Sequence, residues 1–533
     1  MKTPRLFSKA GLGFVWSMAA AQFRKGGRRS QPYKGAEVSR LNQDWIIAPI
    51  STNAAIRQSG RMLRTRARDL ARNNSYIKQF LALLAMNVIG PKGMRLQAQV
   101  RNNDKSLATS LNNKIEAAWL EWSLRPTVTM QGSLKKFARM IIKCVAKDGE
   151  AFIRMVLGYA GNRFMFGLQQ IDPTQIDYDL NRKASPGHNE IRLGVEVDGW
   201  GAAVAYHIAT QDINDSTMHK RVERIPADKI IHLYDPEDAN QTRGVSWLNC
   251  VMLPIKMLEG YAEAELVASR TAAAKMGWLE PKGEDAYEPP EEGDDKQPIE
   301  FEASPGTVEM LPAGLEFKEW SSDHPTTAFS EFMKGQLRTV ASGLHTSYNA
   351  LASDLENVNF SSLRSGLLIE RDVWKTIQDW MADDFYTVIY WRWLEAALLS
   401  GALVLDSRDF RKFLAVKWLP RGWAWVDPLK DTQANILGVG NGLATRTELL
   451  AERGTDLETV LNTLAEEQKL AKDLDVNISA GAAKPAAASA SPDKETGKDD
   501  EGEDVDEDKD GEAGDKALKP NGTGIPAATN HEG

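Results

Sequence analysis

The spacing of apolar residues predicts three helices before residue 150. Residues 51–89 predict one long or interrupted helix, because arginines recur every three or four residues on one face and apolar side chains fill another. The sequence IGPKG at 89–93 supplies the glycines and the proline that end such a helix. Two more helices are predicted, from about 106 to 122 and from 134 to 146.

From residue 151 the pattern changes to short segments that are rich in β-forming residues and separated by turn residues. The segments are AFIRMVL (151–157), RFMFGLQQI (163–171), RLGVEV (192–197), AAVAYHI (202–208) and KIIHLYD (229–235). We expect them to form one small antiparallel sheet. Because helices and strands occupy different regions of the chain, the predicted fold class is α+β.

Helical periodicity then returns in longer segments. One helix is predicted from 246 to 276, with Pro254 expected to kink or break it. A second runs from 326 to 344 with its apolar residues on one face, and a third runs from about 363 to 399. The tryptophans of the third helix have helical spacing, so we expect them in the core. Residues 425–454 predict two or three short helices.

A polar segment, residues 345–362, separates the second of these helices from the third. It contains several amides and two carboxylates between strongly apolar neighbours. This contrast raises the question of what the segment contacts. The residues that would make such a contact are His345, Tyr348, Asn349, Asp354, Glu356, Asn357 and Asn359.

Charge is unevenly distributed along the chain. The net charge of −8 is matched by residues 493–519 alone, which hold 13 acids and five bases. The tail that contains them, 475–533, has almost nothing to bury, so we predict that it is disordered. A second acidic stretch, 280–302, has ten acids, two bases and four prolines. Strands are possible at IEFEA (299–303) and TVEML (307–311).

The N-terminal residues 1–35 carry eight bases and no acid, and we expect a basic arm there rather than a signal peptide. The sequence has no apolar run of the roughly 18 residues that a membrane span needs. Its two cysteines, Cys144 and Cys250, cannot form a disulfide framework. A reducing cytoplasm is therefore the expected site of synthesis and assembly.

The motifs of common enzymes are missing from the sequence. There is no P-loop, and GVGNGL at 438–443 has the wrong glycine spacing for a dinucleotide fingerprint. The seven histidines are scattered, and the clustered carboxylates lie in Pro- or Gly-rich sequence that would not hold a metal rigidly. We therefore predict no catalytic, cofactor-binding or metal site. A third possible function, a metal-dependent nuclease, is disfavoured because it would need rigid carboxylate pairs, and the sequence shows none.

Two features allow competing interpretations. The arginine face of the first helix suits phosphate groups, which leaves a non-enzymatic nucleic-acid-binding structural protein as the alternative function. We favour a solvated face, or pairing with acids such as Asp69 and neighbouring subunits. The face consists of Arg57, Arg61, Arg64, Arg68 and Arg72. His232 is expected to make a structural contact from a strand rather than to act as a ligand or base.

Four stretches resemble lambda-type portal proteins of tailed bacteriophages. The sharpest is RIPADKIIHLYDPEDANQTRGVSWL (224–248), in which a strand ending in a histidine precedes a loop and a Gln-x-Arg-Gly run. The motif residues are His232, Gln241, Arg243 and Gly244. The other three are RTRARDLARNNSYIKQFLALLAMNVIGPKGMRLQ (64–97), GVEVDGWGAAVAYHI (194–208) and WVDPLKDTQANILGVGNGLATRTELLAERG (425–454). The resemblance extends from about 35 to 470.

The resemblance implies a portal-type subunit with a mainly helical wing and stem, a small sheet, a clip insertion and an acidic tail. The implied parts are the basic arm (1–35), the wing (36–245), a stem helix (246–276), the clip (277–325), a second stem helix (326–344), the tunnel loop (345–362), a long wing helix and return (363–424), a crown-like C-terminal helical region (425–474) and the disordered tail (475–533).

The same resemblance implies a ring of subunits, usually twelve, at one capsid vertex of the virion. Double-stranded DNA would pass through the ring, and the terminase large subunit would dock outside. Other implied partners are major capsid, scaffold or protease proteins and a head-completion protein, with no membrane. Twelve helices, each about 10 Å across, enclose a hole of roughly 28 Å, which admits a duplex. Asp354 and Glu356 would then repeat around the channel and repel DNA weakly.

Overall fold

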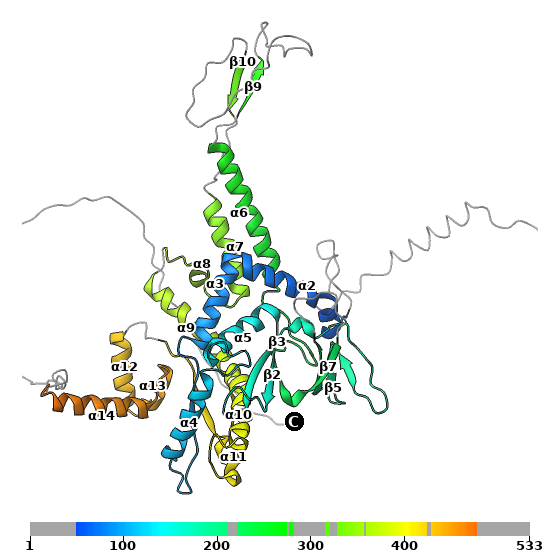
Figure 1. Ribbon diagram of the computed structural model, residues 1–533. Coiled ribbons are helices and arrows are strands. Elements are labelled where there is room, and N and C mark those ends of the chain that lie inside the picture. The colour runs from blue at the N-terminus through cyan, green and yellow to red at the C-terminus, as the bar shows by residue number, and fades with distance from the viewer. Residues whose placement is uncertain are drawn as a thin grey trace, which may run out of the picture. The chain divides into compact units, whose positions relative to one another are not determined.

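The chain is described here from a computed structural model (Figure 1). It describes residues 49–210, 221–273, 277–281, 315–319, 328–356, 359–423 and 428–476. The basic arm, IEFEA, TVEML, Asn357 and the acidic tail beyond 476 lie outside these residues. The chain divides into two compact units, 1–461 and 462–533, and all contacts given below lie within the first.

The predicted first helix is interrupted at Asn74. Helix α2 (Thr52–Asn73) ends there and α3 (Ser75–Leu84) begins, followed by a π-helical turn, η2 (Ala85–Ile89). The backbone N–H of Asn74 donates to the last turn of α2, while its side chain accepts from the N–H of Ile77 at 2.9 Å. Asn74 therefore caps both helices and sets the bend between them.

The next two predicted helices are confirmed as α4 (Thr109–Ser123) and α5 (Leu134–Asp148). Helix α5 ends at Gly149, whose φ of +88° is a left-handed conformation that favours glycine. The chain turns at this glycine directly into β2 (Ala151–Leu157).

The predicted single sheet is wrong, because the strands form two antiparallel sheets. One has the order β3-β2-β8 and the other β4-β5-β6-β7. The added bounds are β3 (Phe166–Ile171), β4 (Glu190–Arg192), β5 (Val195–Val197), β6 (Ala203–Thr210), β7 (Arg221–Pro226) and β8 (Ile230–Leu233). Apolar side chains from both sheets share one buried cluster, which includes Phe152, Val195 and Tyr206. Alternation within a short strand does not specify which sheet the strand joins.

Short connecting elements complete this region. They are the 3₁₀ turns η3 (Pro173–Gln175) and η4 (Ala227–Lys229). Two further strand pairs are two-stranded: β1 (Arg95–Ala98) with β11 (Val416–Leu419), and β9 (Gly277–Pro281) with β10 (Leu315–Glu319). Neither pair was predicted.

Helices α6 (Met252–Ala273) and α7 (Phe329–Gly343) lie side by side (Figure 1). The ring of Tyr261 on α6 contacts the rings of Phe329 and Phe332 on α7, with centroids 5.6 and 5.0 Å apart. The expected kink or break at Pro254 does not occur. Helix α6 begins at Met252, so Pro254 lies in its first turn, where a proline is tolerated.

The predicted third helix is α9 (Phe360–Met381) followed without a break by a π-helical segment, η5 (Ala382–Thr387), and α10 (Val388–Leu399). A short helix, α8 (Tyr348–Ala352), precedes it. The remaining elements are η6 (Ser407–Asp409), α11 (Phe410–Phe413), α12 (Pro428–Gly440), α13 (Arg446–Glu452) and α14 (Leu457–Asp473).

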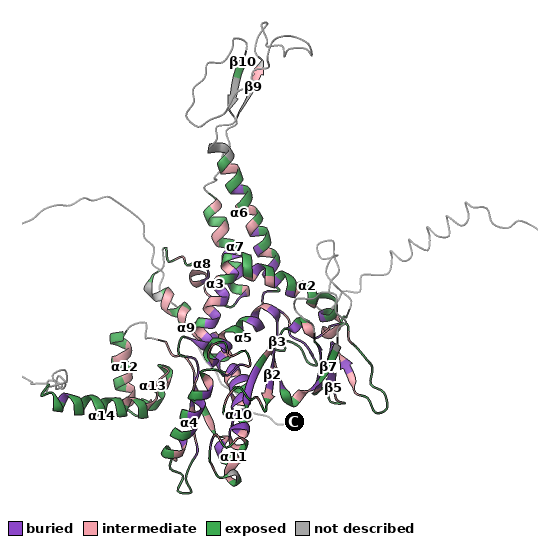
Figure 2. Ribbon diagram, viewed as in Figure 1, coloured by how far each residue is buried: buried purple, intermediate pink, exposed green. Residues whose placement is uncertain are grey.

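The main core lies where α3, α4, α5 and α10 meet, and Figure 2 shows α10 buried along much of its length. Aromatic rings dominate part of it, with Trp119 in edge contact with Trp393 at a centroid distance of 5.1 Å. Trp374 and Trp393 are buried, which confirms their predicted place in the core, whereas Trp391 is 45% exposed and the prediction is wrong for that residue. Among the described residues, no helix combines the length and apolar character of a membrane span.

Candidate functional site

A buried carboxylate, Glu150, lies between α5 and β2. Its Oε1 accepts hydrogen bonds from Nη2 of Arg64 and Nη2 of Arg243, each at 2.6 Å. Its Oε2 lies 3.0 Å from Nε2 of His232 and accepts from the backbone N–H of Gly244 at 3.2 Å. We call Glu150, Arg64, His232 and Arg243 the Glu150 cluster. Because all four side chains are buried or nearly so, each charge needs these partners.

Arg243 links the cluster to both sheets. Its Nη1 donates to the carbonyl oxygens of Ile176 and Leu193, at 3.2 and 2.7 Å. The guanidinium also lies over the ring of Tyr178, 4.4 Å from the centroid. One fully buried side chain therefore joins α2, β2 and the β4–β5 hairpin through a shared set of polar contacts.

The loop before Arg243 is folded by Gln241. The side-chain oxygen of Gln241 accepts from the backbone N–H groups of Glu237 and Asp238, at 3.0 and 3.2 Å. Its amide nitrogen donates to the carbonyl oxygen of Arg243 at 2.9 Å. These bonds fix the backbone of the loop and so position the guanidinium of Arg243 against Glu150.

Gly244 passes against the turn at Gly149. A Cβ added to Gly244 would lie 2.0 Å from the carbonyl oxygen of Gly149, a distance no side chain can occupy. A Cβ added to Gly149 would lie 2.5 Å from the carbonyl carbon of Val245. This approach of two backbones requires glycine at both positions and places Glu150 beside the Gln-x-Arg-Gly loop.

The protonation of the cluster follows from its burial and its charges. Burial acts to raise the pKa of Glu150, but the charge of Arg243 and the hydrogen bonds from His232 and Arg243 hold that pKa well below its usual value. Burial lowers the pKa of His232 despite the opposing effect of Glu150. At neutral pH an ionised Glu150 therefore contacts two guanidinium ions and a neutral imidazole that donates from Nε2.

Most arginines on the arginine face of α2 form ion pairs with carboxylates of the same chain. Four of its five arginines pair with carboxylates: Arg57 with Asp179, Arg61 with Asp177 and Asp179, Arg64 with Glu150, and Arg68 with Asp148 and Asp172. The expected pairing is confirmed, but Asp69 instead accepts from the side chain of Asn73. Arg72 has no carboxylate partner among the residues that the structure describes, and it lines a pocket between α2, α3 and α5.

The polar segment after α7 is anchored at its start. The hydroxyls of Thr346 and Ser347 donate to the buried carboxylate of Glu370 on α9, at 2.8 and 2.9 Å. The side chain of Gln79 on α3 donates to the carbonyl of Ala350 at 3.2 Å. The first half of the segment is therefore held against two helices.

Helix α8 forms inside this segment and was not predicted. Leu351 at its end is buried in the main core. His345 and Ser353, on either side of α8, have φ of +51° and +54°. Residues other than glycine rarely adopt this left-handed backbone conformation. The backbone thus turns sharply before and after one short helix.

Asp354 and Glu356 have partners within the same chain. The Tyr348 hydroxyl donates to Asp354 at 2.7 Å and lowers the pKa of that carboxyl. Nζ of Lys334 lies 3.2 Å from Glu356, and the guanidinium of Arg338 lies over the Tyr348 ring. Two bases of α7 therefore accompany the two acids, so the expectation of uncompensated negative charge here needs revision.

The other candidate residues of the segment are less tightly held. His345 and Asn359 are exposed and Asn349 is half-buried, whereas Asn357 lies outside the described residues. Asn359 caps α9 by accepting from the N–H of Ser362 at 2.8 Å. The described part of the chain contains no group of three His, Cys, Asp or Glu residues arranged to hold a metal.

Sequence reasoning missed Glu150, Lys334 and Glu370. Glu150 had a usable signal, since it stands between a turn glycine and the apolar strand AFIRMVL, where a charge is buried only with partners. Lys334 and Glu370 occupy ordinary positions in helices, and only the tertiary structure shows what they contact.

Comparison with known proteins gives a consistent result. Residues 38–378 match the family described as "Phage portal protein, lambda family". The chain is 32% identical over 474 residues to a probable portal protein of Halomonas phage phiHAP-1, which covers 86% of this chain and 90% of the relative. It is 22% identical over 500 residues to Portal protein B of Escherichia phage lambda, with 86% and 92% covered.

Solved structures of gene transfer agent (GTA) particles are also similar. The neck of a native particle, computed with C12 symmetry, matches with a TM-score of 0.41, 12% identity, and coverage of 75% of this chain and 99% of that chain. The neck of an empty particle, computed with C6 symmetry, matches with a TM-score of 0.43, 13% identity, and coverage of 75% and 94%.

Proposed function

Because this chain belongs to the lambda family of phage portal proteins, we propose that it forms a ring of twelve subunits at one capsid vertex and conducts double-stranded DNA. The family is structural rather than enzymatic. In this proposal the chain supplies no chemistry of its own. It provides a docking ring, a channel for packaging and ejection, and a nucleus for capsid assembly.

The observation that best supports ring formation is that α6 has exposed apolar side chains. Leu253 and Met257 are 71% and 69% exposed. At 3.6 residues per turn these two apolar side chains are one turn apart on the same side of the helix, about 40° from each other. An apolar stripe on a long helix needs a partner surface, and in a closed ring each copy provides one to its neighbour.

The proposed DNA contact is the polar segment at 345–362, the tunnel loop. Its hydroxyl, amide and ion-paired side chains offer hydrogen bonds that exchange readily, without the excess positive charge that would hold phosphates tightly. The pairs of Glu356 with Lys334 and of Asp354 with Tyr348 favour this sequence-blind contact. A duplex slides past a lining of this kind more easily than past a basic one.

The other parts are proposed by the same logic. We assign α6 and α7 to the stem, residues 277–325 to the clip, and 425–474 to the crown-like region. The clip would face the terminase large subunit. The wing, 36–245 with 363–424, would face the capsid and scaffold or protease proteins, and a head-completion protein would bind after packaging. Assembly would occur in the host cytoplasm and the product would reside in the virion.

Electron microscopy of the purified full-length protein tests the ring. We expect end-on views with twelve-fold symmetry and a channel wide enough for a duplex. Leu253→Glu combined with Met257→Glu should abolish these rings. Leu120→Glu, which alters an equally exposed leucine on α4, should retain them. Compact particles without a channel from the unmodified protein would overturn the proposal.

The tunnel-loop assignment needs a separate experiment. Residues 353–358 are replaced by a Gly-Ser linker of equal length, which spares the buried Leu351. We expect intact rings but impaired passage or retention of DNA in particles assembled with this variant. The same replacement at the exposed loop 183–188 is the matched control. Full-length genomes retained by the 353–358 variant would exclude this segment as the DNA contact.

A further inference from the structure

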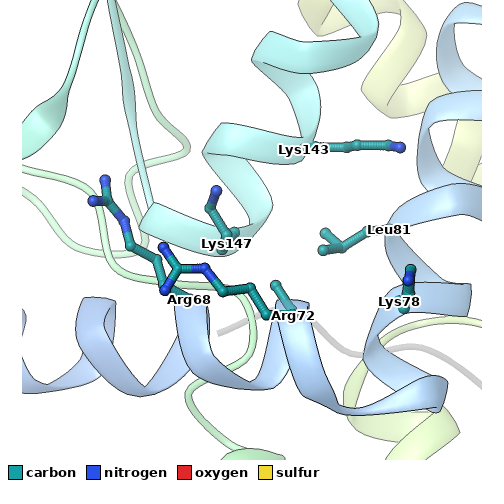
Figure 3. Close-up of a pocket in the computed structure, with 7 residues that line it drawn as sticks. Arg68, Arg72, Lys78, Leu81, Lys143 and Lys147 are labelled. Atoms are coloured by element: carbon teal, nitrogen blue, oxygen red, sulfur yellow. The ribbon is translucent and has the colours of Figure 1, made fainter.

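A pocket of about 290 Å³ lies between α2, α3 and α5 (Figure 3). Its lining has a markedly uneven composition. Besides Ala71 and Leu81, every lining residue is a base and none is an acid: Arg68 and Arg72 from α2, Lys78 from α3, and Lys143 and Lys147 from α5. We call these five bases and the space between them the basic pocket.

The basic pocket has more positive charge than its surroundings neutralise. Arg68 pairs with Asp148 and Asp172, and Lys147 lies 3.9 Å from the same Asp148. Two of the five bases therefore contact these two carboxylates. Among the residues that the structure describes, Arg72, Lys78 and Lys143 have no carboxylate within ion-pair distance, which leaves three uncompensated positive charges around one concavity.

The arrangement is unfavourable for an empty pocket. Arg68 and Arg72 are four residues apart on α2, and Lys143 and Lys147 are four apart on α5, so each helix carries a like-charge pair on one face. The two pairs border the same space (Figure 3). An anion held between the helices would convert this repulsion into attraction.

Helix dipoles explain only part of the pattern. Arg72 and Lys147 lie in the last turns of α2 and α5, where a cation is favoured. Lys143 is in the middle of its helix, and Lys78 is near the N-terminal end of α3, where the dipole disfavours a cation. These two lysines are therefore the best evidence that the pocket serves a ligand.

We propose that the basic pocket binds phosphate groups. Lysine ammonium ions and the Arg72 fork suit tetrahedral phosphate oxygens. The volume lies at the small end of ligand pockets, and it accommodates one or a few phosphates rather than a large organic molecule. Three excess charges also match a phosphate dianion or neighbouring phosphodiesters better than a single carboxylate side chain.

This inference goes beyond the proposed function. It concerns a second site, on α2, α3 and α5, that requires neither the ring nor the tunnel loop. It also restricts the nucleic-acid interpretation of the arginine face, because Arg57, Arg61 and Arg64 are already paired with acids. The phosphate can come from inorganic phosphate in solution or from a nucleic-acid backbone.

Two titrations of the full-length protein test the proposal and separate these sources. The first follows inorganic phosphate by calorimetry at constant ionic strength, and the second follows a 30-base-pair duplex at several salt concentrations. The test variant is Lys78→Gln with Lys143→Gln. The control variant is Lys114→Gln with Lys183→Gln, which removes two exposed lysines outside the pocket. Thermal unfolding verifies that both variants are folded.

We expect phosphate to bind the unmodified and control proteins and to bind the test variant at least tenfold more weakly. If DNA supplies the phosphate, the slope of log K against log salt should decrease in magnitude by about two in the test variant alone. An unchanged slope with weakened phosphate binding identifies free phosphate as the ligand. Equal behaviour of the two variants in both titrations would overturn the proposal. A further titration with poly-glutamate serves as a test of carboxylate binding. If poly-glutamate binds and phosphate does not displace it, the proposal is also overturned.

Discussion

Glu150 and Arg243 form an ion pair with an Oε1 to Nη2 distance of 2.6 Å, and neither side chain has any exposed surface. A pair of this kind is not stabilising simply because it is charged, since both groups lose their hydration. Its importance lies in the groups that depend on it. Arg64, His232 and the backbone of Gly244 all contact the same carboxylate.

Glu150→Gln should therefore destabilise the fold strongly. It leaves two buried guanidinium ions without a counter-charge, and we expect a loss of about 3 to 5 kcal/mol in the free energy of unfolding. Urea denaturation at fixed protein concentration measures it. Glu121→Gln, which breaks the exposed pair with Arg163, should cost about 1 kcal/mol or less. Equal losses in the two variants would contradict a central role for Glu150.

Stability should fall as the pH drops from 6.5 to 5. The pKa of His232 is lowered from its ordinary 6.5 in the folded protein, so the unfolded chain takes up a proton that the folded chain does not. The contribution of this histidine is complete above pH 6.5 and is lost toward its lower folded pKa, by at most about 1.4 kcal/mol per pH unit. Glu150 acts in the same direction only below its ordinary 4.5.

His232→Gln tests this origin, because glutamine preserves a donor for Glu150 but does not titrate. The urea midpoint of this variant should depend less on pH between 6.5 and 5 than that of the unmodified protein. His207, whose pKa is also lowered by burial, leaves a residual dependence. His188→Gln, which removes an exposed imidazole, is the matched control. A profile that is identical in His232→Gln would refute the assignment.

Gly244→Ala should impair folding, because its Cβ would lie 2.0 Å from the carbonyl oxygen of Gly149. We expect a loss of at least about 2 kcal/mol, since one backbone must move and the Glu150 cluster moves with it. Gly199→Ala is the control, because nothing lies within 4 Å of the added methyl group there. Thermal unfolding distinguishes the two variants, and a Gly244→Ala protein as stable as the control would be inconsistent with the close backbone contact.

Glu370→Ala should loosen the start of the polar segment 345–362 without unfolding the core. The hydroxyls of Thr346 and Ser347 lose their acceptor, so amides of residues 346–352 should exchange with deuterium faster. Hydrogen exchange with mass spectrometry measures this effect. Asp372→Ala, which alters an exposed acid two residues along the same helix, should not change exchange in that segment.

Local patterns predicted most of the helices and strands and little of what connects them. The helix α5 and the strand β2 follow directly from periodicity and from the turn at Gly149. The partners of Glu150 are 82 to 94 positions away, and no sequence period relates them. The division of the strands into two sheets and the π-helical turn η5 depend likewise on tertiary packing.

The polar segment 345–362 illustrates the same limit. Its polar composition identified it as a candidate contact, but composition did not reveal that Lys334 compensates Glu356 or that Leu351 enters the core. Charge on a short segment is set by the surrounding helices as much as by its own residues. The predicted acidic lining was derived from the loop alone and omitted the bases of α7.

The pairing of β1 with β11 constrains how the chain folds during synthesis. The N-terminal core is closed by residues made much later: Arg421 donates to the side chain of Asn87, 334 positions earlier, and β11 forms the partner of β1. At translation speeds of roughly 5 to 20 residues per second, α2 to α5 wait about 15 to 70 seconds for that partner. During this time the unpaired edge of β1 is available to other nascent chains, so chaperone protection would matter most before residue 419 leaves the ribosome.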